Sequence, residues 1–146
     1  MQIADVIRER GPLTVAAFMD LALYDTALGY YARAAQRSGR AGDFFTSVDV
    51  GSLFGELLEV QLEDIFRTSD FVLRTFDLVE AGAGNGRLSA DILRAAKHRD
   101  PAFYDAIRLH LVEASAEARR AQAATLGDVA DRLTSSGSAL DRKSVV

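Results

Sequence analysis

The stretch Phe76-Asp-Leu-Val-Glu80-Ala-Gly82-Ala-Gly84-Asn-Gly86-Arg-Leu88 decides the fold of this chain. It is predicted to form an apolar strand that runs into a glycine-rich turn and then into a helix. The helix carries its apolar residues on one face, so we expect it to pack on a sheet; these residues are Leu88, Ile92, Leu93 and Ala96. A strand, turn and helix in this order bring backbone N–H groups and a helix N-terminus close to a ligand.

A second apolar run, Ile107–Val112, ends in the acidic residue Glu113. Glu113 lies 27 residues after Gly86, which leaves room for a crossover helix and a return to a parallel strand. A carboxylate at the tip of this strand is placed to accept hydrogen bonds from both hydroxyls of a ribose. Together these features predict an α/β fold that binds a nucleoside. The plainer alternative is an ordinary tight turn and a solvated strand end.

The spacing of the three glycines separates two classes of nucleotide-binding turn. Nicotinamide and flavin dinucleotide folds usually have G-x-G-x-x-G, in which the third glycine allows close packing of helix on strand. Here the third glycine is Gly86, one position early, and Arg87 stands at the dinucleotide position. The turn, preceded by Glu80, resembles motif I of the class I S-adenosylmethionine-dependent methyltransferases. A nicotinamide-binding oxidoreductase fragment is the alternative, and the position of Gly86 argues against it.

Helices and one long connection precede this unit. A short amphipathic helix is expected before Gly11-Pro12, and Thr14 is placed to cap a helix from Val15 to about Tyr24. The connection 28–47 is polar, rich in glycine and long, which is typical of a functional loop. A helix with a strong apolar rhythm follows. Its expected buried stripe comprises Val50, Leu53, Phe54, Leu57, Leu58, Leu62 and Ile65, with Gln61 as the polar exception.

The chain is predicted to have three segments. Residues 1–70 hold the helices and a lid-like loop, and residues 71–127 hold the β-α-β unit and the helix after it. In that second segment Asp100 and Pro101 are expected to start a short helix, and Ser115 is expected to cap the last one. Residues 128–146 are polar and are predicted to be a frayed or non-native tail.

Two strands are few for a fold of this kind. A doubly wound sheet normally has five or more strands, so we expect the chain to be the N-terminal part of a larger protein, or one cut short near residue 127. We also expect it to be catalytically inactive by itself. Because unpaired sheet edges recruit other chains, the fragment is predicted to self-associate.

Five segments, in order and spacing, resemble the MidA-type family of S-adenosylmethionine-dependent methyltransferases. They are Gly11–Tyr24, Leu28–Tyr31, Gly42–Ser47, Leu53–Glu56 and the glycine turn. Mitochondrial members of that family dimethylate arginine on a subunit of respiratory complex I and help to assemble the complex. The resemblance implies a partial class I methyltransferase (Rossmann-like) fold with an N-terminal helical segment. A non-catalytic interaction module with this fold is a further alternative.

The resemblance also implies a site. S-adenosyl-L-methionine is the expected cofactor, and its expected contacts are Glu80, Gly82, Gly84, Gly86, Glu113, Asp43 and Thr46. The loop Gly42–Ser47 and the segment Phe54-Gly-Glu56 are expected near the mouth of the site. The expected acceptor is an arginine on a protein, and the resemblance offers a respiratory-complex subunit as the candidate. No residue is assigned to catalysis, and no metal-ligand spacing is found.

Composition narrows the function and the compartment. The formal net charge is −4, which argues against binding to nucleic acid. Since the chain has no cysteine, disulfides, thiolate zinc sites and cysteine nucleophiles are excluded. No apolar run approaches the ~20 residues of a membrane span, and the N-terminus does not resemble a signal peptide. Basic residues that are nearly all arginine indicate a bacterial gene, and the predicted location is the bacterial cytoplasm.

Overall fold

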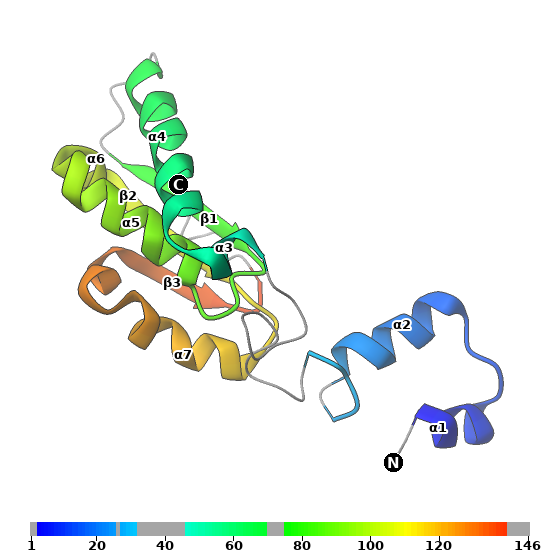
Figure 1. Ribbon diagram of the computed structural model, residues 1–146. Helices are drawn as coiled ribbons and strands as arrows, with labels where there is room; N and C mark the ends of the chain where they lie inside the picture. The colour runs from blue at the N-terminus through cyan, green and yellow to red at the C-terminus, as the bar shows by residue number, and fades with distance from the viewer. Residues whose placement is uncertain (1–2, 26, 32–45, 70–74, 140–146) are drawn as a thin grey trace. The chain divides into compact units, whose positions relative to one another are not determined.

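The computed structural model describes residues 3–25, 27–31, 46–69 and 75–139 (Figure 1). The chain divides into two compact units, Met1–Phe44 and Phe45–Val146. This boundary differs from the one expected near residue 70, because the long helix that follows residue 52 packs with the second unit. Among the described residues, no helix combines the length and the apolar character needed to cross a membrane.

The described part of the first unit contains two helices, α1 (Ile3–Arg10) and α2 (Val15–Tyr24). Thr14 caps α2 as predicted, since its hydroxyl oxygen accepts a hydrogen bond from the N–H of Ala17 at 3.2 Å. The turn after α2 is closed by the carboxylate of Asp25, which accepts from the N–H of Leu28 at 2.8 Å.

The described residues of the second unit form a parallel sheet of three strands, in the order β1 (Phe76–Ala81), β2 (Ile107–Val112) and β3 (Leu133–Gly137). The helices α5 (Arg87–Arg99) and α6 (Pro101–Ala106) connect β1 to β2. The helix α7 (Ala116–Leu126) and the 3-10 helix η1 (Gly127–Arg132) connect β2 to β3. Asp100 caps α6 as predicted, because its side chain accepts from the N–H groups of Ala102 and Phe103.

The third strand corrects two expectations. Residues 128–146 were expected to be a frayed tail, but the described part of this stretch forms η1 and β3. The sheet therefore has three strands among the described residues, not two. A register shift between Leu109 and His110 places His110 opposite Ser135 and Leu111 opposite Ser136. The two serines consequently point to opposite faces of the sheet.

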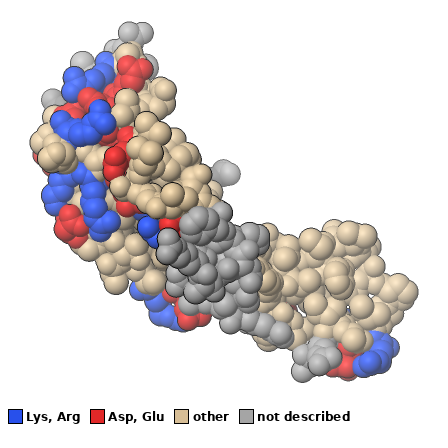
Figure 2. Space-filling view, in the orientation of Figure 1, with Lys and Arg blue, Asp and Glu red and all other residues tan. Residues whose placement is uncertain are grey.

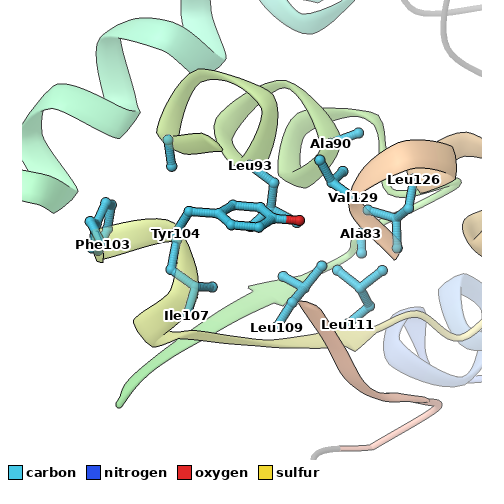
Figure 3. Close-up of a cluster of buried hydrophobic side chains, with 11 residues drawn as sticks. Ala83, Ala90, Leu93, Phe103, Tyr104, Ile107, Leu109, Leu111, Leu126 and Val129 are labelled. Atoms are coloured by element: carbon cyan, nitrogen blue, oxygen red, sulfur yellow. The ribbon is translucent and has the colours of Figure 1, made fainter. Parts of the chain in front are cut away.

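One face of the sheet carries the hydrophobic core. Figure 3 shows Leu93 of α5 and Val129 of η1 facing Leu109 and Leu111 of β2. Leu93, Leu109 and Val129 are fully buried. Full burial of one such side chain stabilises a fold by about 1.5–3 kcal/mol relative to its exposure. This cluster fixes the layer of helices against the strands.

The second unit also contains the helices α3 (Ser47–Val50) and α4 (Leu53–Thr68). α4 packs on α5 through a face that includes Gly55 and Glu59, and its Leu62 and Phe66 reach the core. The expected apolar stripe is largely wrong: Leu53 and Leu57 are 65% and 60% exposed. The buried face lies elsewhere because the close crossing with α5 selects the small residue Gly55.

Candidate cofactor-binding site

The glycine turn joins β1 to α5 with three left-handed residues. Gly82, Gly84 and Gly86 have φ values of 72°, 52° and 83°. Glycine adopts this region readily, whereas a Cβ would be strained there. A Cβ at Gly82 or Gly84 would have nothing within 4 Å, so the backbone at both positions is open to a ligand. Gly86 differs, because a Cβ there would lie 3.3 Å from Cδ1 of Leu111.

The turn is fastened to the end of the second strand. The N–H groups of Gly82 and Ala83 both donate to the carbonyl oxygen of Val112, at 2.8 and 3.1 Å. The N–H of Gly86 donates to the carbonyl of Ala83 at 2.8 Å and closes the turn. The turn and the strand end that carries Glu113 thus form one connected site.

Glu113 lies against the turn, as its place at the strand end suggests. Its Oε2 accepts a hydrogen bond from the N–H of Gly84 at 2.8 Å, and its Oε1 accepts from the N–H of Ser115 at 2.7 Å. A carboxylate offers about four acceptor positions. Each oxygen of Glu113 therefore keeps capacity for a further donor, such as a hydroxyl group.

Glu80 contacts a different partner. Its carboxylate accepts a hydrogen bond from the hydroxyl of Ser89, a buried residue of α5. Burial raises the pKa of Glu80, the bond from Ser89 opposes that rise, and the charge of Glu113 adds to it. The predicted contact of Glu80 with a cofactor stays a prediction, since the described bond directs it to α5.

The sequence did not single out Gln122, which lies beside the same turn. It is 1% exposed and shares the buried face of α7 with Ala118 and Leu126. Its Nε2 donates to the carbonyl of Gly84 at 2.9 Å. Its spacing from Ala118 and Leu126 was a usable signal, because a polar residue at a buried helix position needs partners.

Two predicted contacts are not placed at the turn. Asp43 lies outside the described residues, as does most of the lid-like loop Gly42–Ser47. Thr46 is described, and its N–H and hydroxyl both donate to the carboxylate of Asp49 at the start of α3, at 2.8 and 2.9 Å. Cofactor binding by these two residues remains a prediction.

Glu56 lines a groove between α4 and α5 with a volume of about 370 Å³. Its carboxylate accepts from the hydroxyl of Ser52 at 2.5 Å. Asp91, Arg94 and His98 of α5 line the other side, and burial raises the pKa of Asp91. Among the described residues, no group of acidic residues and histidines is arranged to hold a metal ion.

A polar chain crosses the other face of the sheet. Nδ1 of His110 lies 2.9 Å from the hydroxyl of Ser135, and its Nε2 lies 3.2 Å from Oδ1 of Asp77. The order Ser-His-Asp matches a hydrolase triad in composition only. Both oxygens of Asp77 accept from Arg108, at 2.7 and 2.6 Å. Burial opposes the charge of Asp77, but the bonds from Arg108 and His110 prevail and lower its pKa. We therefore assign these polar side chains a structural role: their bonds join the three strands.

Charged groups of the second unit pair across its surface. On the face shown in Figure 2, basic and acidic side chains lie next to one another. Arg94 contacts Asp128 at 3.0 Å, and Arg67 contacts Asp100 at 2.9 Å. These pairs neutralise positive charge locally.

Comparison with known proteins identifies the family of the chain. The sequence model of the family described as "Putative S-adenosyl-L-methionine-dependent methyltransferase" matches residues 57–142. The chain is 40% identical over 123 residues to the mouse (Mus musculus) mitochondrial protein arginine methyltransferase NDUFAF7, covering 84% of this chain and 28% of that protein. The human (Homo sapiens) protein of the same name is 38% identical over 122 residues, covering 82% and 27%.

A solved structure matches the fold. The crystal structure of a "likely methyl transferase" from Burkholderia thailandensis, bound to S-adenosyl-homocysteine, aligns with a TM-score of 0.73 and 28% identity. The alignment covers 91% of this chain and 35% of that one. The described sheet and helices are thus part of a Rossmann-like methyltransferase fold, as predicted.

The fold and the site define a class of nucleoside-binding α/β proteins, the class I methyltransferases. Within that class the chain belongs to the S-adenosyl-L-methionine-dependent methyltransferase family whose model it matches, which confirms the predicted MidA-type resemblance. These matches do not favour the nicotinamide-binding alternative. The chain spans 28% of the length of the mouse relative.

The predicted location is corrected by the same relatives. We expected a bacterial cytoplasmic protein from the arginine-rich composition, but the mouse, rat (Rattus norvegicus) and human relatives are all named as mitochondrial. Arginine preference reflects coding habit and carries no physical information about the compartment, so it misled the prediction.

Proposed function

We propose that this chain forms the cofactor-binding part of an S-adenosyl-L-methionine-dependent enzyme that methylates arginine on a protein. The observation that carries the proposal is the bond between Gly84 and Glu113. It joins an open glycine turn to the carboxylate of the next strand end. The names of the curated relatives support arginine as the acceptor.

The residues of the site fit this cofactor. The turn at Gly82 and Gly84 presents bare backbone with no atom within 4 Å of either Cβ position, so a flat nucleoside could approach closely. Glu113 retains acceptor capacity on both oxygens, which suits the paired hydroxyls of a ribose. When bound, the cofactor supplies an electrophilic methyl group on a sulfonium.

The chain's own residues would bind the cofactor and orient it. The glycine turn holds the backbone in a fixed shape, and Glu113 fixes the ribose end relative to that shape. Catalysis in such an enzyme comes largely from holding the acceptor nitrogen in line with the methyl group and from excluding water. The finer proposal, that the acceptor belongs to a respiratory-complex subunit, rests on the family resemblance.

Calorimetry with a panel of ligands tests the proposal. We expect S-adenosyl-homocysteine and S-adenosyl-L-methionine to bind the chain, and NADH to give no heat above dilution. Binding of NADH alone would favour the oxidoreductase alternative. Binding of neither class would favour an interaction module that keeps the fold without the ligand.

Self-association is a second part of the proposal. Among the described residues β1 pairs with β2 alone, which leaves one of its edges without a partner strand. α4 also exposes large apolar side chains, among them Leu53 and Leu57. An unpaired edge and an exposed apolar face both favour association with another chain.

A further inference from the structure

The peptide groups of Gly84 are held on both sides by side chains. Oε2 of Glu113 accepts from the N–H of Gly84 at 2.8 Å, and Nε2 of Gln122 donates to its carbonyl at 2.9 Å. Gly84 has a φ of 52° and no side chain, so steric contacts restrict its backbone little. Its orientation therefore depends on these two bonds.

The amide of Gln122 is itself fixed by the third strand. Its Oε1 accepts from the hydroxyl of Ser136 at 2.5 Å. This bond occupies the oxygen and leaves the NH₂ group for the carbonyl of Gly84, so both ends of the amide are satisfied. Gln122 is 1% exposed, so its amide depends on these two partners, whereas Ser136 itself is exposed.

Gly137, the residue of β3 after Ser136, supports Glu113, the other residue that holds Gly84. The N–H of Glu113 donates to the carbonyl of Gly137 at 2.8 Å. Ser136 and Gly137 are consecutive, and they reach Gly84 by two routes, through Gln122 and through Glu113. The register shift in β3 makes this possible, since it sets Ser136 opposite Leu111, on the side of α7.

We propose that Gln122 is a positioning residue of the cofactor site, and that Ser136 sets its orientation, so that β3 controls the shape of the glycine turn. Gln122 acts through the backbone of Gly84. The proposal rests on the proposed function for its effect on S-adenosyl-homocysteine, but its effect on the turn does not depend on any ligand.

The test compares adjacent serines. Ser136→Ala removes the hydroxyl that bonds to Gln122, and Ser135→Ala, the matched control, removes the one that bonds to His110 on the opposite face. We expect Ser136→Ala to weaken S-adenosyl-homocysteine binding roughly three- to tenfold, the scale of one neutral hydrogen bond. Ser135→Ala should bind like wild type, and Ser136→Thr, which keeps the hydroxyl, should restore affinity.

A ligand-free readout separates this inference from the proposed function. In NMR spectra of the chain alone, Ser136→Ala and Gln122→Met should speed amide exchange of Gly84, whose N–H is bonded to Glu113, at least threefold, and Ser135→Ala should not. If wild type fails to bind S-adenosyl-homocysteine, the proposed function fails while the exchange data still decide the role of Gln122. Unchanged exchange in Ser136→Ala, or an equal effect in Ser135→Ala, would overturn the inference.

Discussion

Gly55 of α4 lies directly against Asp91 of α5. A methyl group at position 55 would come within 2.6 Å of Cβ of Asp91 and 3.1 Å of the backbone N of Ile92. The contact is with backbone and Cβ atoms, which cannot rotate away. The absence of a side chain at Gly55 is therefore what lets α4 approach α5 closely.

Gly55→Ala should destabilise the second unit. Although alanine favours a helix by about 1 kcal/mol over glycine, overpacking of this crossing should cost more, about 1–3 kcal/mol. We expect a net loss of free energy of unfolding in urea titrations. Gly51→Ala is the matched control, because nothing lies within 4 Å of its Cβ position. A stabilised Gly55→Ala protein would show that the helices can separate freely.

Gly84→Val should abolish S-adenosyl-homocysteine binding. Valine resists a φ of 52°, and its side chain would fill the open space beside the turn. Gly11→Val provides the control, since Gly11 in the first unit has a φ of 83° and nothing within 4 Å of its Cβ position. Both variants should lose stability, but calorimetry should show lost binding only for Gly84→Val. Retained affinity in that variant would remove the turn from the site.

Glu113→Ala should weaken S-adenosyl-homocysteine binding by about 1.5–3 kcal/mol, the usual scale for hydrogen bonds to a charged group. The variant also frees the N–H groups of Gly84 and Ser115, so the turn should lose order as well. Glu117→Ala, at an exposed position of α7, tests the general effect of removing an acid nearby. Equal affinities for wild type and Glu113→Ala would contradict the assignment.

The part of the site that could be predicted is local in sequence. The strand, the glycine turn and the helix follow one another directly in the sequence. The shape of the turn requires left-handed backbone at Gly82, Gly84 and Gly86, which few residues other than glycine adopt. Glu113 is more distant, but it ends the next apolar run, and ends of adjacent parallel strands meet at one edge of the sheet. The spacing in the sequence was therefore enough to predict that Gly84 and Glu113 lie close together.

The parts that could not be predicted depend on distant partners. β3 looked like a polar tail because Ser135 and Ser136 face His110 and Gln122, whose bonds satisfy them only in the folded chain. The apolar rhythm of α4 likewise indicated a buried face, but the crossing at Gly55 selects a different one. In both cases tertiary contact overrode the local pattern.

The isolated chain should form dimers or larger species in solution. The open edge of β1 and the exposed Leu53 and Leu57 provide the surfaces. Light scattering at micromolar concentration should report more than the monomer mass. Leu53→Lys with Leu57→Lys should lower that mass if α4 carries the contact, and should leave it unchanged if the edge of β1 does. A monodisperse wild-type monomer would contradict self-association by either surface.

Glu59→Leu should stabilise the chain at neutral pH. Glu59 is fully buried on α4, and neither carboxylate oxygen has a hydrogen-bond partner; Nε of Arg99 lies 3.5 Å from Oε2. Burial raises the pKa of Glu59 above its usual value near 4.5, and the charge of Arg99 only partly offsets the rise. Because the unsatisfied group is removed and the half-exposed Arg99 can turn to solvent, we expect a gain of about 1 kcal/mol.

The sign of the pH dependence checks the cause. A carboxyl with a raised pKa in the folded state binds its proton more tightly there, so the free energy of unfolding falls as pH rises from about 4.5 through the raised value. Glu59→Leu should lose this part of the slope, so its advantage should be largest at pH 7 and smallest near pH 4. Glu117→Leu is the control, since Glu117 is exposed on α7, does not act on Glu59, and its loss should bring no gain. If Glu59→Leu is less stable than wild type at pH 7, the buried carboxylate contributes an interaction that its raised pKa does not reveal.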